Sequence, residues 1–432
     1  MKLSGMNIPK THPSKKFIYI SSGMSYTVRK RFTRETELAT AELLTSMALK
    51  TSELYKEHSF GYLVNALTEK GLGETLNNIY DNKLLVIGDS GGLQAITLGK
   101  KSDDLMKNGV YQTQSQLVDF AMSFDEIPVT LTSNRSTFHD TASRFFDPTI
   151  FDEKARQSGE NLKKQIEYFK KVGTTSKPFL IVQGNSMAYY QRWIDIILDT
   201  VGEDNHKYIG GIASGAAALG QGKLEDVKRI WYLTKLNAPD HIKSVIHVLG
   251  LGAISRLLPL VAFKMGGYFP DTVFTYDSTT HTSGLSNGNF TKGYGLHSLS
   301  RVRDANYMRL IQYYIETAKK TFGIDLKEDM VFNLICRPID EYYALYGKDV
   351  YNQHLTLNGM FYTSVSLFLE SFEKVLESEH NFIDACKGLD HIYMPLKNVR
   401  DDKDFLEWER KLGCNLPSKA VPVREQLIEL DF

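Results

Sequence analysis

Short apolar runs that alternate with longer amphipathic stretches are the feature of this sequence that most restricts its fold. Seven runs rich in β-branched and aromatic residues are typical of strands, at 17–20, 84–87, 120–124, 179–182, 208–209, 245–249 and 272–276. Between them, apolar residues recur at helical spacing, most clearly over 34–55, 152–172, 187–200 and 224–236. Strands that alternate with helices predict a parallel sheet with crossover helices.

The number of runs favours an α/β fold of the closed (β/α)8 TIM-barrel type, with residues 61–66 as the eighth strand. A doubly wound open sheet has the same alternation and is the competing fold. Beyond residue 300 the pattern changes to long helices, at 301–322 and 360–376. We therefore expect residues 1–300 to form the barrel with an N-terminal elaboration. Residues 301–432 are expected to form a mainly helical part packed on the barrel.

Composition narrows the class of protein further. The 51 basic residues balance 51 acidic ones, so net charge neither supports nor excludes a nucleic-acid partner. Cys336, Cys386 and Cys414 match no metal or disulfide spacing. The most apolar stretch, 244–263, contains charged residues and a proline, which disfavours a membrane span. Residues 1–16 lack an apolar targeting core, and we expect a cytoplasmic protein without a membrane partner.

Polar or glycine-rich segments directly follow the predicted strands, from the second strand onward. They are 89–92, 125–128, 183–186, 210–215, 250–252 and 277–279. A single Asp in such a place is more often a helix N-cap, and Gly-Gly is usually part of a turn. In a barrel, however, the carboxyl ends of all strands meet at the face where active sites are built. Six segments in register predict one pocket lined by carboxylates, an amide and bare backbone.

Residues 88–92, Gly-Asp-Ser-Gly-Gly, also occur around the nucleophile of chymotrypsin-like serine proteases. Such a protease needs a histidine base and a second aspartate, usually in a disulfide-bonded double β-barrel. The upstream His58 lies in Tyr-Lys-Glu-His-Ser, and the chain has only 3 cysteines. This context disfavours the protease.

The ordered motifs resemble those of the tRNA-guanine transglycosylases, which are (β/α)8 barrels that exchange a guanine in nucleic acid for a 7-deazaguanine. The matching segments lie between residues 80 and 290, and none is decisive alone. They are 89–94 (Asp-Ser-Gly-Gly-Leu-Gln), 124–126 (Phe-Asp-Glu), 182–184 (Val-Gln-Gly), 209–213 (Ile-Gly-Gly-Ile-Ala), 249–252 (Leu-Gly-Leu-Gly) and the last strand with Asp277.

The resemblance implies two catalytic carboxylates. By motif position Asp277 is the nucleophile, and a carboxylate at C1′ can form a covalent glycosyl intermediate. Asp89 is the general acid/base that handles the proton of the departing and incoming bases. The target nucleotide has to leave the base stack to reach them.

The resemblance also implies the residues that hold the base. Asp125 accepts hydrogen bonds from the N1–H and amino edge of guanine, where both facing groups are donors. Gln183 reads the carbonyl side of the base, and Gly211 and Ile212 offer backbone contacts. Ser90 has a minor role, either on the base or in capping the following turn.

The chain departs from the tRNA-acting enzymes after the nucleophile. Residues 278–335 contain no cysteine, whereas those enzymes carry a Cys-x-Cys-x-x-Cys and His zinc site there. We expect no metal and no cofactor. The departures resemble the DNA-acting branch of the family, found in bacteriophages and bacterial DNA-modification clusters. That branch inserts 7-deazaguanines such as 7-cyano-7-deazaguanine into DNA.

We therefore expect DNA and a free 7-deazaguanine base as partners. Action on tRNA is the alternative, and a catalytically silent transglycosylase-like subunit is another, although the presence of both Asp89 and Asp277 argues against silence. The sequence leaves open whether a homodimer or an accessory protein that opens DNA takes part.

Clustered cations are the candidates for contact with the nucleic-acid backbone. Arg29, Lys30, Arg31 and Arg34 surround Phe32, a combination suited to phosphate contact and base stacking. Lysine pairs at 15–16, 163–164, 170–171 and 319–320 are further candidates, each equally consistent with a solvated helix surface.

Overall fold

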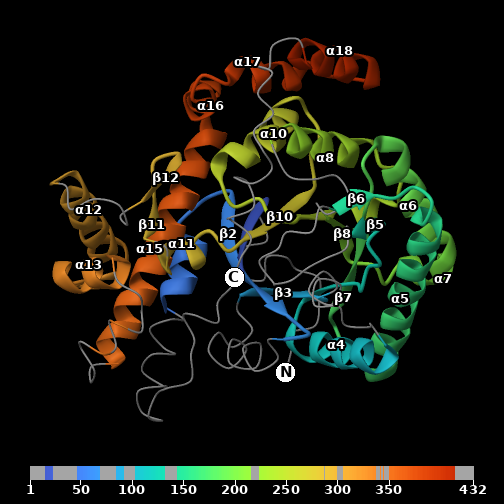
Figure 1. Ribbon diagram of the computed structural model, residues 1–432, viewed down its shortest axis with the longest axis horizontal. Helices are drawn as coiled ribbons and strands as arrows, with labels where there is room; N and C mark the ends of the chain where they lie inside the picture. Colours follow the sequence, from blue (N-terminus) through green and yellow to red (C-terminus); the bar gives the residue numbers. More distant parts are fainter. Residues whose placement is uncertain are drawn as a thin grey trace.

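Eight parallel strands close into a barrel in the computed structural model (Figure 1). The structure describes residues 15–22, 46–68, 84–91, 103–131, 144–215, 223–286, 288–298, 305–336, 341, 344 and 350–413. The barrel strands are β1 (Phe17–Ser21), β2 (His58–Asn65), β3 (Leu85–Asp89), β4 (Phe120–Met122), β7 (Lys177–Val182), β8 (Gly211–Ser214), β9 (Val245–Val248) and β10 (Val273–Ser278). β1 pairs with β2 on one side and with β10 on the other, which closes the ring. The predicted TIM barrel is confirmed, including a strand at 61–66.

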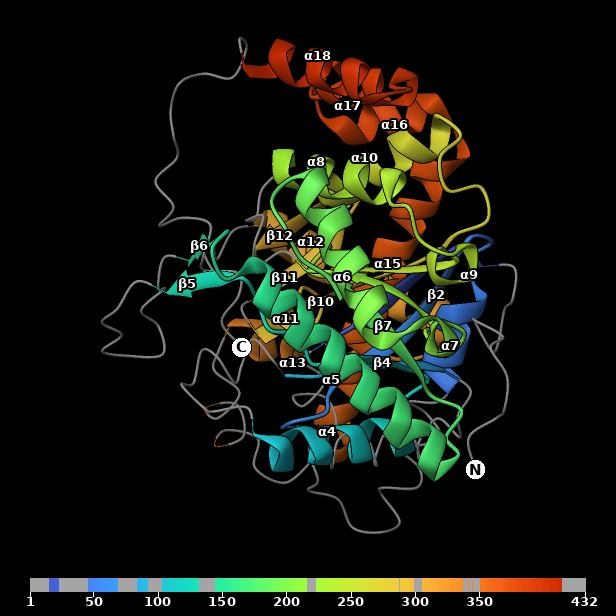
Figure 2. The same cartoon turned by 90° about the vertical axis from the view of Figure 1, so that its right-hand side faces the viewer.

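Helices cover the outside of the barrel (Figure 2). They are α4 (Asp104–Leu117), α5 (Phe151–Val172), α6 (Met187–Val201), α7 (Glu203–His206), α8 (Lys223–Lys235), α9 (Asp240–Lys243) and α10 (Ile254–Met265). The helices expected from periodicity at 152–172, 187–200 and 224–236 are confirmed. Of the helix predicted at 34–55, the described part is helical over 46–53. Residues 1–14 and 23–45, where the N-terminal elaboration was expected, lie outside the described residues.

The strands send alternate side chains to the inside and the outside of the barrel, as the period of two requires. The inward side chains form a separate apolar cluster, in which the rings of Phe120 and Phe179 stack with centroids 4.6 Å apart. The outward side chains join the main core beneath the helices. This alternation decides which polar residues face the barrel mouth.

The strand predicted at 208–209 is wrong, because β8 begins at Gly211 instead. Gly210 and Gly211 are needed for packing: a Cβ on Gly210 would lie 3.0 Å from the Phe120 ring, and one on Gly211 would lie 2.5 Å from the Phe179 ring. Glycines at the start of β8 therefore leave room for these rings. The carboxyl end of β8 is therefore Ser214, three residues later than its first glycine.

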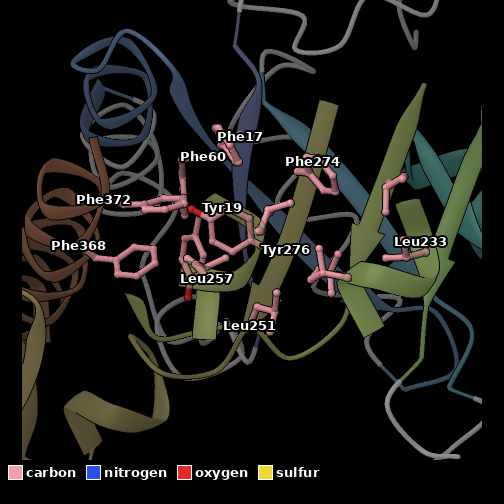
Figure 3. Packing of buried hydrophobic residues seen from close by; sticks show 14 of the residues in the cluster. Phe17, Tyr19, Phe60, Leu233, Leu251, Leu257, Phe274, Tyr276, Phe368 and Phe372 are labelled. Carbon is pink, nitrogen blue, oxygen red and sulfur yellow. The ribbon is translucent and has the colours of Figure 1, made fainter. Parts of the chain in front are cut away.

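The C-terminal helices share the core of the barrel. They are α12 (Ala305–Phe322), α13 (Glu328–Cys336), α15 (Val350–Glu377), α16 (Glu379–Cys386), α17 (Asp390–Tyr393), a 3-10 helix (Met394–Asn398) and α18 (Asp402–Gly413). Figure 3 shows Phe368 and Phe372 of α15 beside Tyr19 of β1, and the Tyr19 and Phe368 ring centroids are 5.4 Å apart. Glu373 of α15 also accepts hydrogen bonds from the backbone N–H groups of residues 56 and 57.

Two small antiparallel hairpins follow barrel strands. The first pairs β5 (Val129–Leu131) with β6 (Arg144–Phe146), and the second pairs β11 (Asn289–Lys292) with β12 (Gly295–Ser298) after the short α11 (Ser283–Ser286). In the described part of the chain, no helix is both long enough and apolar enough to cross a membrane.

Candidate active site

Three of the predicted site residues lie at the carboxyl ends of their strands and face the barrel interior. Asp89 is the last residue of β3, Gln183 directly follows β7, and Asp277 is the penultimate residue of β10. Each stands two positions after an inward-facing residue of its own strand, so the strand period turns all three toward the same mouth. The charges of Asp277 and His247 both act on Asp89, which places these groups near one another.

Asp277 is held by the loop after β9. Its Oδ1 accepts a hydrogen bond of 2.8 Å from the backbone N–H of Gly250, and its side chain is 11% exposed. Gly250 has a φ of +76°, a conformation that favours glycine. The Gly-Leu-Gly segment therefore presents a backbone donor to the carboxylate.

A buried ion cluster fixes this loop from outside the barrel. Asp226 accepts hydrogen bonds from Arg229 at 2.9 Å and from Nε of Arg256 at 2.7 Å. The two guanidinium groups donate in turn to the carbonyls of Leu249 and Gly250, at 2.9 and 2.6 Å. A buried cluster of paired charges that also donates to main-chain carbonyls can hold a backbone segment in one conformation.

Asp89 has the electrostatics of a general acid/base. Burial raises its pKa to about 6, hydrogen bonds from the backbone of Gly91 and Ser90 oppose that rise, and the charge of Asp277 adds to it. A carboxyl group with a pKa near 6 can exchange a proton close to neutral pH, whereas an ordinary Asp cannot. Ser90 is buried beside it, at the turn that Gly91 makes with a φ of +74°.

Asp125 and Gln183 form a buried pair. The Nε2 of Gln183 donates a hydrogen bond of 2.7 Å to Oδ2 of Asp125. Burial raises the pKa of Asp125 to about 7, the bond from Gln183 opposes the rise, and the charge of Asp89 increases it. The Oε1 of Gln183 is buried and has no hydrogen-bond partner among the described residues. A buried polar atom left open in this way can accept a hydrogen bond from water or a bound ligand.

Helix α5 holds the backbone on both sides of Asp125. The Oγ of Ser158 accepts from the N–H of Glu126 at 2.8 Å, and Nδ2 of Asn161 donates to the carbonyl of Phe124 at 3.0 Å. The neighbouring Glu126 carboxylate is paired with Lys107, 3.3 Å away. Asp125 is thus the residue of this segment that is left to face the pocket.

Gly211 and Ile212 do not lie with the other predicted site residues. Gly211 is the first residue of β8, and the side chain of Ile212 points outward into the main core. The backbone contacts to the base that the resemblance implies for these two residues stay a prediction. The carboxyl end of β8 places Ser214 and Gly215 nearest the mouth instead.

The absence of a side chain at Gly215 leaves room for Gln183. The addition of one methyl group there, by Gly215→Ala, should therefore have a measurable effect. A Cβ on residue 215 would lie 2.5 Å from Nε2 of Gln183. We expect Gly215→Ala to displace this amide, to destabilise the protein by about 1–3 kcal/mol, and to raise the pKa of Asp125 above about 7, because the hydrogen bond that lowers it is lost. Carboxyl NMR titration and urea unfolding measure the two effects.

Gly109→Ala is the matched control for that substitution. Gly109 lies inside α4, and a Cβ there would meet no atom within 4 Å. Replacement of a helical glycine by alanine should leave stability unchanged or raise it by about 0.5–1 kcal/mol. If the pKa of Asp125 were unaltered in Gly215→Ala, the position of the Gln183 amide would not depend on this glycine.

Of the predicted phosphate contacts, one cluster lies outside the described residues and one lysine pair lies far from the strand carboxyl ends. Arg29, Lys30, Arg31 and Arg34 lie outside the described residues. The pair at 170–171 lies in the last turn of α5, whereas the helix begins on the side of the strand carboxyl ends. That pair is therefore remote from the pocket.

His247 is a site residue that the sequence interpretation missed. It lies in β9, is fully buried, and its Nε2 is 3.4 Å from Oδ1 of Asp277. The alternation of side chains along the strand could have identified it. Because Ile246 and Val248 face outward, His247 between them faces the barrel interior. His281 is different, because its Nδ1 bonds Ser364 of α15 at 2.9 Å.

The chain matches no protein-family model, and it has no significant match among curated proteins. Within the residues that the structure describes, no group of three or more His, Cys, Asp or Glu side chains is arranged to hold a metal ion.

Proposed function

We propose that the protein is a base-exchange transglycosylase that replaces guanine in DNA with a 7-deazaguanine, such as 7-cyano-7-deazaguanine, through a covalent aspartyl intermediate. The observation that carries the proposal is the meeting of three carboxylates with distinct environments at one barrel mouth. Asp277 is held by a backbone donor, Asp89 has a pKa of about 6, and Asp125 is paired with Gln183. The order of the sequence motifs supports the same chemistry.

In the first half of the reaction, a carboxylate oxygen of Asp277 attacks C1′ of the target nucleotide. The C1′–O bond forms as the C1′–N9 bond breaks, and the electron pair goes to the departing guanine. Protonated Asp89 supplies a proton to that base. The pKa of about 6 supports this role, because part of the population is protonated near neutral pH.

In the second half, the incoming base attacks C1′ and gives its proton to Asp89. The bond between C1′ and Asp277 breaks, and its electron pair returns to the carboxylate. Asp277 and Asp89 thus return to their starting states, and the reaction balances without an oxidant or a metal ion.

Recognition of the base is assigned to Asp125 and Gln183. An ionised Asp125 accepts from N1–H and the amino group of guanine, and the second N–H of the Gln183 amide is available for the carbonyl oxygen. A base without these donors leaves a buried carboxylate unpaired, which is strongly unfavourable.

The test is the incorporation of labelled guanine into duplex DNA, single-stranded DNA and unmodified tRNA. Label in DNA supports the proposal, and it should depend on Asp277. Label in tRNA alone would keep the chemistry and overturn the choice of polymer. Label in none of the three, with a folded protein, would favour a binding subunit.

Binding of the free base should depend on pH. Only the ionised form of Asp125 accepts two donors, so the bound base lowers the pKa of this carboxyl from its value of about 7. Affinity for 7-cyano-7-deazaguanine should therefore weaken as the pH falls through 7, by about tenfold for each further unit. Calorimetry between pH 5 and 8 measures this slope and the accompanying proton release.

Asp125→Asn should bind the base weakly and lose the pH dependence. Asp152→Asn, which removes an exposed carboxylate paired with Arg192, should keep the wild-type profile. Equal affinity at all pH values in the wild type would contradict the assigned role of Asp125.

A further inference from the structure

His247 lies inside the barrel directly against Asp277, and the mechanism above does not use it. The residue is fully buried. Its Nδ1 is 2.8 Å from Oγ1 of Thr275, and its ring stacks on Phe179 with a centroid separation of 6.4 Å. Its Nε2 is buried without a hydrogen bond in the described part of the chain and lies 3.4 Å from Oδ1 of Asp277.

The partners of the ring determine which nitrogen carries the proton. An ionised carboxylate only accepts, so the nitrogen that faces Asp277 has to be the donor. A neutral imidazole then has a bare Nδ1, which accepts from the hydroxyl of Thr275. Thr275 can supply that proton because a threonine hydroxyl both donates and accepts. The geometry is therefore satisfied by one tautomer, protonated at Nε2.

Two nitrogen atoms approach the same oxygen of the nucleophile. Gly250 N–H is 2.8 Å from Oδ1, and His247 Nε2 approaches that oxygen as well. Among the described residues, no hydrogen bond reaches Oδ2, and the Asp277 side chain retains 11% exposure. Oδ2 is thus the oxygen left to react.

We propose that His247 is a positioning residue: its Nε2–H and the Gly250 N–H hold Oδ1 of Asp277, so that Oδ2 attacks C1′. The inference rests on the proposed function. No proton is transferred in this role. The donor at Oδ1 is most important when the ester bond to Oδ2 breaks, because the negative charge then returns to the carboxylate.

His247→Phe tests the role with the least change in packing, because a ring remains to stack on Phe179. We expect kcat for base exchange to fall about 100-fold, the size found for removal of one donor to a developing negative charge. KM for the base should change little, since Asp125 and Gln183 hold it. The covalent protein–DNA adduct should accumulate on denaturing gels, because release of Asp277 is slowed more than attack.

Two further variants separate positioning from packing. His247→Gln retains an N–H at similar reach and should recover activity relative to the Phe variant. Thr275→Val removes the hydroxyl that fixes the tautomer and should lower kcat by about tenfold, the cost of one neutral hydrogen bond. Wild-type kcat in a folded His247→Phe variant would overturn the proposal.

The tautomer of His247 can be tested in the protein without substrate, so this test does not depend on activity. Long-range 1H–15N NMR of histidine-labelled full-length protein, with His247→Gln to assign the signal, reports which ring nitrogen of His247 is protonated. We expect a proton on Nε2 and a changed Nε2 signal in Asp277→Asn. A proton on Nδ1 instead would overturn the proposal, even if His247→Phe failed to fold. The expected NMR pattern together with no base exchange by the wild type would reject the proposed function and leave the His247–Asp277 pairing supported.

Discussion

Asp277→Asn is expected to abolish base exchange, with a loss of about 10⁴-fold or more in kcat, as for other nucleophile replacements. An amide cannot form the aspartyl bond to C1′, and its oxygen still accepts from the N–H of Gly250, so the fold of the loop is retained. Incorporation of labelled guanine measures the activity. The covalent protein–DNA adduct should also be absent.

Asp271→Asn is the matched control for the nucleophile. Asp271 is an exposed carboxylate just before the amino end of β10, whereas Asp277 lies near the carboxyl end of the same strand. It should retain wild-type exchange and stability. If Asp277→Asn kept activity within about tenfold of wild type, a covalent route through this residue would be wrong.

Asp226→Asn is expected to cause the largest loss of stability, about 3–5 kcal/mol, because it removes the negative charge from a buried ion cluster. Asp226 and Arg229 are each only 2% exposed, and Arg229 has no other carboxylate hydrogen-bonded to it in the described residues. Burial already lowers the pKa of Arg229, and the charge of Asp226 opposes this. Urea unfolding, with the slope compared between variants, measures the loss.

Two comparisons test that explanation. Asp152→Asn breaks the exposed ion pair with Arg192 and should cost less than about 1 kcal/mol. The double variant Asp226→Asn/Arg229→Met removes the uncompensated buried charge and should be more stable than Asp226→Asn alone. A loss below about 1 kcal/mol in Asp226→Asn would show that the cluster is not needed to stabilise the fold.

Asp226→Asn also links the outer cluster to the pocket. Arg229 and Arg256 hold the carbonyls of Leu249 and Gly250, and the N–H of Gly250 bonds the nucleophile. A weaker cluster should loosen this loop, and base exchange should fall even under conditions where the variant is folded.

Much of the barrel and part of its mouth could be predicted because they follow from local patterns. Strand and helix periods are properties of neighbouring residues, and alternation of the two in a chain of this length favours a closed parallel barrel. The positions of Asp89, Gln183 and Asp277 follow from the same logic, because residues after parallel strands meet at one end.

The strand at β8 could not be located from its own residues. The run 208–209 looks like a strand because it is apolar, but the glycines that follow form the strand itself. They do so because aromatic rings on β4 and β7 occupy the space that a side chain would need. Those rings are distant in sequence, so no local pattern contains this information.

The architecture and the set of polar residues at the strand ends follow from local patterns, since periodicity and strand direction act along the chain. The partners of these residues are set by contacts that form when the chain folds. Asp226, Arg229 and Arg256 meet behind the Gly250 loop, and His247 faces Asp277 across two neighbouring strands. Such pairings depend on burial and on contacts between separate elements, which set the pKa values and hydrogen bonds of the site.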